Sequence, residues 1–306
     1  MTLSIITINY NNKDGLQKTI ESVVKQRVKD FEWIIIDGGS TDGGKELIEE
    51  NAQHFTYWCS ERDKGIYNAM NKGIKVANGD YCLFLNSGDS LYDEDVIEKV
   101  LKELDGTDFI SGDLWCVDEQ GNRVRAAIQP DVLTRHHMFV QTLDHQGTFI
   151  KTSLLKKRPY DDSLKIAADW EQQFHEIILN GKTYKHINFF ISNFLLGGVS
   201  GNPEHLALHM NERKRVMLKH FTQQEIDTTL LKHYASVDND WSKTRKIQVA
   251  YDGILDSYYT PKTYKETFGP FMHPLPYHHL LRVRLFVWMS LHGLLPLVRT
   301  IMKLKK

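Results

Sequence analysis

The chain has 306 residues, of which 41% are hydrophobic and 25% are charged, a composition typical of folded globular proteins rather than disordered chains. Its formal net charge is −1, so it lacks the basic field of many nucleic-acid-binding proteins, and no nucleic-acid partner is expected. The three cysteines have no CxxC spacing, which argues against a zinc site or a disulfide framework.

Short β-branched segments alternate with amphipathic segments in the first part of the chain. Strands are predicted at Leu3–Ile8, Phe31–Ile36, Thr56–Cys59 and Tyr81–Leu85. A helix between the first two strands would begin at Asn12 or Asp14, either of which can serve as its N-cap. Further helices are predicted from about residues 40–42 and over Tyr67–Val76. These strand–helix–strand repeats predict a doubly wound α/β sheet whose first strands are parallel and buried.

The pattern is less regular after Gly88. Segments 109–117 and 123–128 flank a turn and predict a hairpin, and two more strands are predicted over residues 146–150 and 187–196. From Glu204 onward the chain is predicted to be mainly helical. We therefore predict a first domain over residues 1–202 and a helical C-terminal region over residues 203–306.

The last segment, residues 277–306, combines apolar residues with cations. It contains no Asp or Glu, and its basic residues are Arg282, Arg284, Arg299, Lys303, Lys305 and Lys306. Because the apolar runs are too interrupted for a transmembrane helix, a basic amphipathic segment on an anionic membrane is favoured over a helix docked on its own domain or on a partner. No secretory signal pattern opens the chain, so we expect a cytoplasmic protein, peripheral on the inner face of the cell membrane.

Carboxylates and amides follow the predicted strands. Asp37 ends the second strand, Asp63 and Lys64 follow the third, and Asn86 and Asp89 follow the fourth. Open parallel sheets bind ligands at the carboxyl ends of their strands, so we expect these side chains to converge on one crevice. The sequence contains neither GxxxxGK[ST] nor GxGxxG, which excludes the common phosphate-binding loop and the dinucleotide fingerprint.

Four segments resemble family-2 inverting glycosyltransferases, in particular the bacterial group that builds surface polysaccharides. They are SIITINYNN (Ser4–Asn12), WIIIDGGSTDG (Trp33–Gly43), SERDKGIYNAMNKGIKVANGDYCLFLNSGD (Ser60–Asp89) and IAADWE (Ile166–Glu171). The resemblance implies a GT-A fold, which is a Rossmann-like, nucleotide-binding, doubly wound mixed sheet, here followed by a C-terminal helical extension. It also implies transfer of a sugar from a nucleotide-sugar donor, first of all a UDP-sugar, to a saccharide or a polyprenyl-linked oligosaccharide acceptor.

The resemblance further implies a set of nucleotide-binding residues. These are Asn9, Tyr10, Asp37, Asp63, Lys64 and Asn86. Tyr10 would lie near the base, and Asp37 matches the first acid of the family's VDDGSxD pattern, which contacts the uracil and ribose region. In this chain Gly38 replaces the second acid of that pattern.

A divalent metal, Mn²⁺ or Mg²⁺, is implied by the segment Leu85-Asn86-Ser87-Gly88-Asp89, which matches the family's LDxDD motif. Only its last acid is retained, and Asp89 is the predicted metal ligand. Mg²⁺ typically takes one or two carboxylates together with substrate phosphates, so one Asp can suffice. His145 is a second candidate ligand, or else a hydrogen-bonded structural histidine. The cation would stabilise the charge on the departing nucleoside diphosphate.

Asp169 matches the acid that removes the proton from the acceptor hydroxyl in this family. Direct displacement by that hydroxyl would invert the anomeric carbon. We expect the apolar neighbour Trp170 to raise the pKa of Asp169, which would suit a general base. Two alternatives stay open: Glu171 as the base, and Asp169 as the N-cap of a helix over residues 170–179.

Other functions remain to be weighed against sugar transfer. A non-catalytic binding module of the same fold is an alternative, because Asn86 and Gly88 replace acids of the metal motif. A sugar nucleotidyltransferase is another, although Ser4–Asn12 contains no glycine-rich loop. A third alternative, a membrane-anchored structural protein, is based on the C-terminal segment alone and does not account for residues 60–89.

Overall fold

The computed structural model describes residues 1–198, 205–226 and 229. The chain divides into two units, the first made of Met1–Leu133 and Thr142–Asn202, the second of Thr134–Gln141 and Pro203–Lys306. No helix in the described part of the chain is both long enough and apolar enough to cross a bilayer. The segment predicted to lie on a membrane, residues 277–306, falls outside the described residues.

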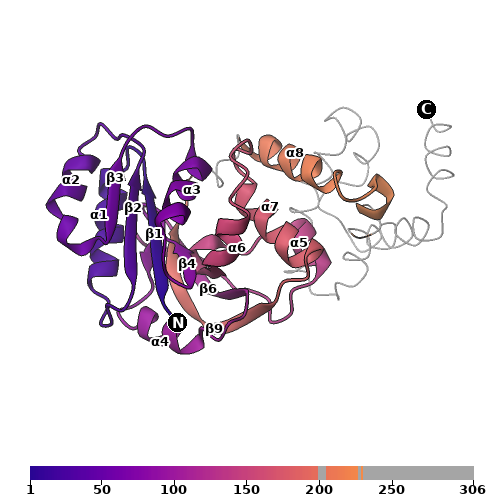
Figure 1. The fold of residues 1–306 in the computed structure, drawn as a ribbon, viewed down its shortest axis with the longest axis horizontal. Helices are drawn as coiled ribbons and strands as arrows, with labels where there is room; N and C mark the ends of the chain where they lie inside the picture. Colours follow the sequence, from indigo (N-terminus) through magenta and orange to yellow (C-terminus); the bar gives the residue numbers. More distant parts are fainter. Residues whose placement is uncertain (199–204, 227–228, 230–306) are drawn as a thin grey trace, which may run out of the picture. The chain divides into compact units, whose positions relative to one another are not determined.

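The first half of the first unit alternates strands with helices (Figure 1). In chain order these are β1 (Leu3–Asn9), α1 (Lys13–Val24), β2 (Glu32–Asp37), α2 (Gly44–Glu50), β3 (Tyr57–Ser60), α3 (Ile66–Val76) and β4 (Tyr81–Phe84). The second half is β5 (Ser90–Leu91), α4 (Val96–Glu103), β6 (Phe109–Val117), β7 (Arg123–Ala127), β8 (Thr148–Lys151), α6 (Thr152–Lys157), α7 (Ala168–Phe174) and β9 (Tyr184–Leu195). A short π-helix, His175–Leu179, continues α7.

Nine strands of the described residues form one mixed sheet. The order is β3-β2-β1-β4-β8-β6-β9-β5, and β7 pairs with β6 at its side. The four strands β3, β2, β1 and β4 are mutually parallel, as predicted, whereas β8 joins β4 and β6 in antiparallel fashion. The predicted α/β class and mixed doubly wound sheet are therefore confirmed.

The buried strands are apolar on both faces because helices cover both. On one face, Ile5 and Ile35 belong to a buried cluster with residues of α1, α2 and α4. On the other face lies α3, which approaches so closely that a Cβ on Gly73 would be 2.5 Å from Ile6 Cγ2. Successive strand residues point to opposite faces, so this two-sided covering explains the uninterrupted β-branched runs.

Local capping sets where the first two helices begin. The Asn12 side chain accepts a hydrogen bond from the Gly15 amide at 3.2 Å, so Asn12 is the N-cap of α1. Helix α2 begins later than predicted, at Gly44, after Gly43 in a left-handed conformation with φ of 93°. The reason is that residues 39–42 form a turn in which the Gly39 and Ser40 amides and the Ser40 hydroxyl donate to Asp37 at the end of β2.

The second unit is helical in its described part. It contains α5 (Arg135–Val140) and α8 (Leu206–Met217). Phe139 and Phe221 pack edge to face with ring centroids 5.4 Å apart, and the Arg135 guanidinium lies 5.5 Å from the centre of the Phe221 ring.

Candidate functional site

Asp37 is the centre of a polar cluster at the carboxyl ends of the parallel strands. In register it lies between Asn9 of β1 and Ser60 of β3. Its Oδ1 accepts hydrogen bonds from Asn9 Nδ2 (2.8 Å) and Ser40 Oγ (2.5 Å). Its Oδ2 accepts from Ser60 Oγ (2.6 Å), the Ser40 amide (2.9 Å) and the Gly39 amide (3.1 Å). Burial raises the pKa of Asp37, but these donors outweigh burial and lower it below its usual value.

The turn after β1 presents an exposed aromatic ring beside this cluster. Tyr10 is 65% exposed. The next residue, Asn11, has a positive φ of 47°, and its side chain accepts a hydrogen bond from the Thr41 amide at 2.8 Å. Asp63 is half-buried and Lys64 is exposed, both just after β3. The positive φ of Asn11, held by the hydrogen bond from Thr41, indicates that the turn that carries Tyr10 is already formed without a ligand.

The residues Asn86–Asp89 follow β4 beside the end of β1; because the sequence predicts a metal ligand there, we call them the metal turn. The Ser87 amide donates to the Ile8 carbonyl (3.0 Å), and Asn12 Nδ2 donates to the Ser87 carbonyl (2.9 Å). The Asp89 amide donates to the Asn86 carbonyl (3.0 Å), which closes the turn. These hydrogen bonds place Asn86 and Asp89 at the same sheet edge as Asn9.

Asp89 is a buried carboxylate, only 4% exposed. Its Oδ1 accepts a hydrogen bond from the Leu195 amide at 3.1 Å. Burial raises its pKa to about 7, although the charge of His145 and the hydrogen bonds act in the opposite direction. In the same turn, Asn86 Oδ1 is buried and has no hydrogen-bond partner among the described residues. The metal turn therefore holds one buried carboxylate and one buried amide oxygen that lacks a partner among the described residues.

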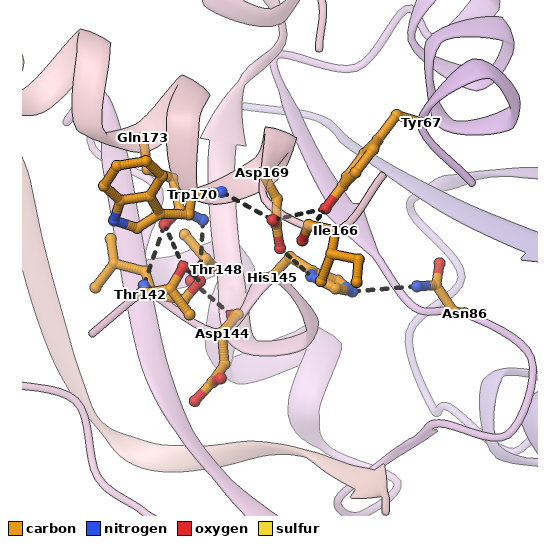
Figure 2. Close-up of polar contacts among 11 residues, drawn as sticks. Tyr67, Asn86, Thr142, Asp144, His145, Thr148, Ile166, Asp169, Trp170 and Gln173 are labelled. Carbon is orange, nitrogen blue, oxygen red and sulfur yellow. Dashed lines mark hydrogen bonds and ion pairs between the residues drawn. The ribbon is translucent and has the colours of Figure 1, made fainter. Parts of the chain in front are cut away.

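His145 connects the metal turn to Asp169 (Figure 2). Its Nδ1 donates to Asp169 Oδ2 at 3.0 Å, and its Nε2 lies 3.1 Å from Asn86 Nδ2, within hydrogen-bond distance. Burial lowers the pKa of His145, but the hydrogen bond and charge of Asp169 outweigh burial and raise it. Because both ring nitrogens have protein partners, the predicted coordination of a metal by His145 would require one of these contacts to break.

Asp169 lies in the first turn of α7 with 14% of its side chain exposed. Its Oδ1 lies 2.9 Å from the hydroxyl of Tyr67, a residue of α3, and accepts from the Trp170 amide at 2.8 Å. Burial raises the pKa of Asp169, but the hydrogen bonds and charge of His145, with these further donors, lower it overall. The predicted rise in pKa was therefore wrong, because the donors outweigh the apolar surroundings.

Two sequence alternatives for this segment can also be compared with the structure. Helix α7 begins at Ala168 with Ala167 at its N-cap, so the prediction of Asp169 as the N-cap was wrong. Glu171 forms a buried ion pair with Arg158 and is 8% exposed in its side chain. Glu171 is held by Arg158 and lies outside the hydrogen-bonded chain of Asn86, His145 and Asp169.

The structure brings together most of the predicted site residues, and it adds others. Asn9 and Asp37 form one hydrogen-bonded group, and Asn86, His145 and Asp169 form another, with Asp89 beside it. Sequence reasoning missed the residues that orient the carboxylates, which are Ser40, Ser60 and Tyr67. All three lie in the segments that resemble the family, but no pattern there pointed to their contacts with the carboxylates.

Comparison with known proteins identifies the family. The profile of glycosyl transferase family 2 matches residues 4–164, more than half of the chain. The chain belongs to glycosyl transferase family 2. The match includes the strand ends, the metal turn and His145, and it ends before Asp169.

Relatives of known sequence support this assignment. An uncharacterised glycosyltransferase of Mycobacterium tuberculosis is 40% identical over 176 residues, which is 56% of this chain and 66% of the relative. A PGL/p-HBAD biosynthesis glycosyltransferase of Mycobacterium bovis is 31% identical over 175 residues, 55% of this chain and 66% of that protein. The matches thus span just under two thirds of these relatives.

Solved structures share the fold. TarS from S. aureus in complex with UDP-GlcNAc superposes with a TM-score of 0.58 at 16% identity, over 99% of this chain and 91% of TarS. The mannosyltransferase PcManGT from Pyrobaculum calidifontis, in complex with GDP-Man and Mn²⁺, gives a TM-score of 0.52 at 13% identity, over 99% and 87% of the two chains. The GT-A fold expected from the sequence is confirmed.

Proposed function

We propose that this family-2 glycosyltransferase moves a sugar from a nucleotide-sugar donor to a hydroxyl of a saccharide or lipid-linked oligosaccharide, with inversion at the anomeric carbon. The observation that carries the proposal is the hydrogen-bonded chain from Asn86 through His145 to Asp169. This chain joins the turn that would face the donor diphosphate to a carboxylate that would face the acceptor. One hydrogen-bonded arrangement would thereby position both the group that stabilises charge on the donor and the group that removes the proton from the acceptor.

The metal turn fits a hard divalent cation such as Mn²⁺ or Mg²⁺. Asp89 and the unpartnered Asn86 Oδ1 supply oxygen, the ligand type that these cations prefer. A cluster of three or more His, Cys, Asp or Glu is not found among the described residues, so substrate phosphates would complete the coordination. When bound, the cation would offset the charge that grows on the leaving diphosphate.

Asp169 is the group that we assign to the acceptor proton. Its lowered pKa keeps it ionised at neutral pH, so it can accept a proton without first losing one. Oδ1 is taken up by Tyr67 and Trp170, whereas Oδ2 accepts only from His145 among the described residues and retains a second lone pair. Oδ2 is therefore the atom that would receive the proton while His145 fixes its direction.

A donor screen tests the proposed function. Purified protein with Mn²⁺ would be incubated with UDP-sugars and GDP-sugars, since solved structures of this fold hold UDP-GlcNAc or GDP-Man. Acceptors would be polyprenyl-linked oligosaccharides and free saccharides. We expect metal-dependent release of nucleoside diphosphate and a product of inverted anomeric configuration by NMR. Retained configuration, or no release with any donor, would contradict the proposal.

The variant Tyr67→Phe should shift the pH dependence of transfer. The Tyr67 hydroxyl lowers the pKa of Asp169, so its removal should raise that pKa. The acidic limb of kcat/KM should then move to higher pH, by up to about one pH unit. Tyr160→Phe is the matched control, because Tyr160 packs on Tyr67 while its buried hydroxyl has no partner among the described residues. An unchanged acidic limb in Tyr67→Phe would count against Asp169 as the base.

The basic C-terminal segment is proposed to bind an anionic membrane at the cytoplasmic face. Removal of residues 277–306 should release the protein from phosphatidylglycerol vesicles in a sedimentation assay. Neutralising Arg282, Arg284 and Arg299 to Gln should lower partitioning about a hundredfold, since each cation near such a surface contributes about 1 kcal/mol. Phosphatidylcholine vesicles are the control. Equal sedimentation of full-length and truncated protein would dismiss the proposal.

A further inference from the structure

A cavity of about 280 Å³ lies between the metal turn, helix α1 and the hairpin of β6 and β7. Gly88 of the metal turn and Lys18 of α1 line it, and the hairpin contributes Val117 and Arg123. In the described part of the chain, none of the residues that we assign to the nucleotide, the metal or the acceptor proton lines this cavity. The cavity therefore borders the proposed active site without being part of it.

Arg123 is held in this cavity by a stack of three aromatic rings. Tyr92 and Trp115 both stack on Phe190, with ring centroids 5.2 Å and 5.3 Å from the Phe190 centroid. The guanidinium carbon of Arg123 lies 4.7 Å from the centre of the Tyr92 ring and 5.4 Å from the centre of the Trp115 ring. Contact with aromatic faces orders a guanidinium and leaves its N–H groups available to other partners. The stack thus supplies the cavity with a positioned cation.

Neither cation of the cavity pairs with an acid among the residues that the structure describes. The Arg123 guanidinium has only its aromatic contacts there, and Lys18 Nζ donates to the Glu119 carbonyl at 3.3 Å. Asp118 also lines the cavity, but its oxygens accept from the Asn122 amide at 2.8 Å and from Asn122 Nδ2 at 3.0 Å. Asp118 therefore shapes the hairpin turn, and no described acid competes with an external anion for the two cations.

We infer that this cavity, which we call the anion pocket, binds a phosphate group between Lys18 and Arg123. The fork of N–H groups on an arginine matches the oxygens of a phosphate, and a lysine adds a compact charge. The inference goes beyond the proposed function, because such binding requires neither a nucleotide nor a metal. Two sources share this chemistry, namely a free inorganic phosphate or diphosphate and the diphosphate headgroup of a polyprenyl-linked saccharide. Val117 and Leu195, which also line the pocket, would contact the apolar part of the second ligand.

Calorimetric titration with inorganic diphosphate tests the inference, in EDTA and at constant ionic strength so that no metal contributes. We expect saturable binding by the wild type and at least about tenfold weaker binding by Arg123→Gln, as for hydrogen bonds to a charged group. Lys18→Gln should weaken binding to a similar extent without disturbing the aromatic stack. Arg125→Gln is the matched control and should bind as the wild type does, because Arg125 is an exposed arginine of the same strand that does not line the pocket.

A second titration, with geranyl diphosphate, distinguishes the two sources of phosphate. Tighter binding of geranyl diphosphate than of inorganic diphosphate would assign the pocket to a lipid-linked headgroup, and equal or weaker binding would assign it to free ions. The inference would be overturned if the wild type showed no saturable binding of either probe, or if Arg125→Gln lost as much affinity as Lys18→Gln and Arg123→Gln. Because neither nucleotide nor metal is present, these outcomes leave the proposed sugar transfer to be decided by the donor screen alone.

Discussion

Asp169→Asn is expected to lower the rate of sugar transfer about 10²–10⁴-fold while donor affinity stays within about threefold of wild type. The amide has nearly the same shape as the carboxylate but cannot take the acceptor proton. Within the described part of the chain, hydrogen bonds join Asp169 to the metal turn through His145 and Asn86 alone, so its neutralisation should leave the donor side largely intact. The rate would be measured in single-turnover transfer and the affinity by calorimetry with the donor.

The control for this variant is Asp162→Asn. Asp162 is an exposed acid in the segment before α7, and the one hydrogen bond that it accepts from the described residues comes from Asn68 at 3.2 Å. It should retain full transfer. If Asp169→Asn lost donor affinity and transfer rate to the same extent, the assignment of Asp169 as the general base would be wrong. The carboxylate would then contribute to donor binding and not to removal of the acceptor proton.

The parallel half of the sheet was predictable because its signal is local. Strands β1 and β2 are buried on both faces and read as nearly continuous β-branched runs, so their ends were predicted to within one residue. The convergence of Asn9 and Asp37 followed from the rule that parallel strands end at one edge. By contrast, the two-residue strand β5 exists only because it pairs with β9, far away in the chain, and it has no pattern of its own.

The chemistry of the site depended on contacts that no local pattern contains. The sign of the pKa shift of Asp169 is set by His145 and by Tyr67, which is 102 residues away. From the sequence only the apolar neighbour Trp170 was visible, and it pointed to the wrong sign. The sequence left His145 open between a metal ligand and a hydrogen-bonded structural histidine, because its two hydrogen-bond partners lie 24 and 59 positions away.

Asp89→Asn should abolish metal-dependent transfer and at the same time stabilise the metal-free protein. Burial raises the pKa of Asp89 from 3.8 to about 7. The folded protein therefore holds this proton more tightly than the unfolded chain, and stability declines as the pH rises from about 4 to 7. Above that window the cost reaches at most about 4 kcal/mol, for a shift of about three pKa units. Asparagine carries no charge to bury and removes this cost.

Thermal unfolding at two pH values, with and without Mn²⁺, tests both parts of this prediction. Without metal, Asp89→Asn should unfold at a higher temperature than wild type at pH 8 and at nearly the same temperature at pH 4. Mn²⁺ should stabilise the wild type and leave the variant unchanged, because a ligand that binds only the folded state raises its stability. Asp93→Asn is the control, since Asp93 pairs with Lys99 at 2.9 Å and its removal should bring no gain. If the metal-free variant were less stable than wild type at pH 8, the ionised Asp89 carboxylate would stabilise the fold even without a cation. The assignment of Asp89 as the metal ligand would then be contradicted.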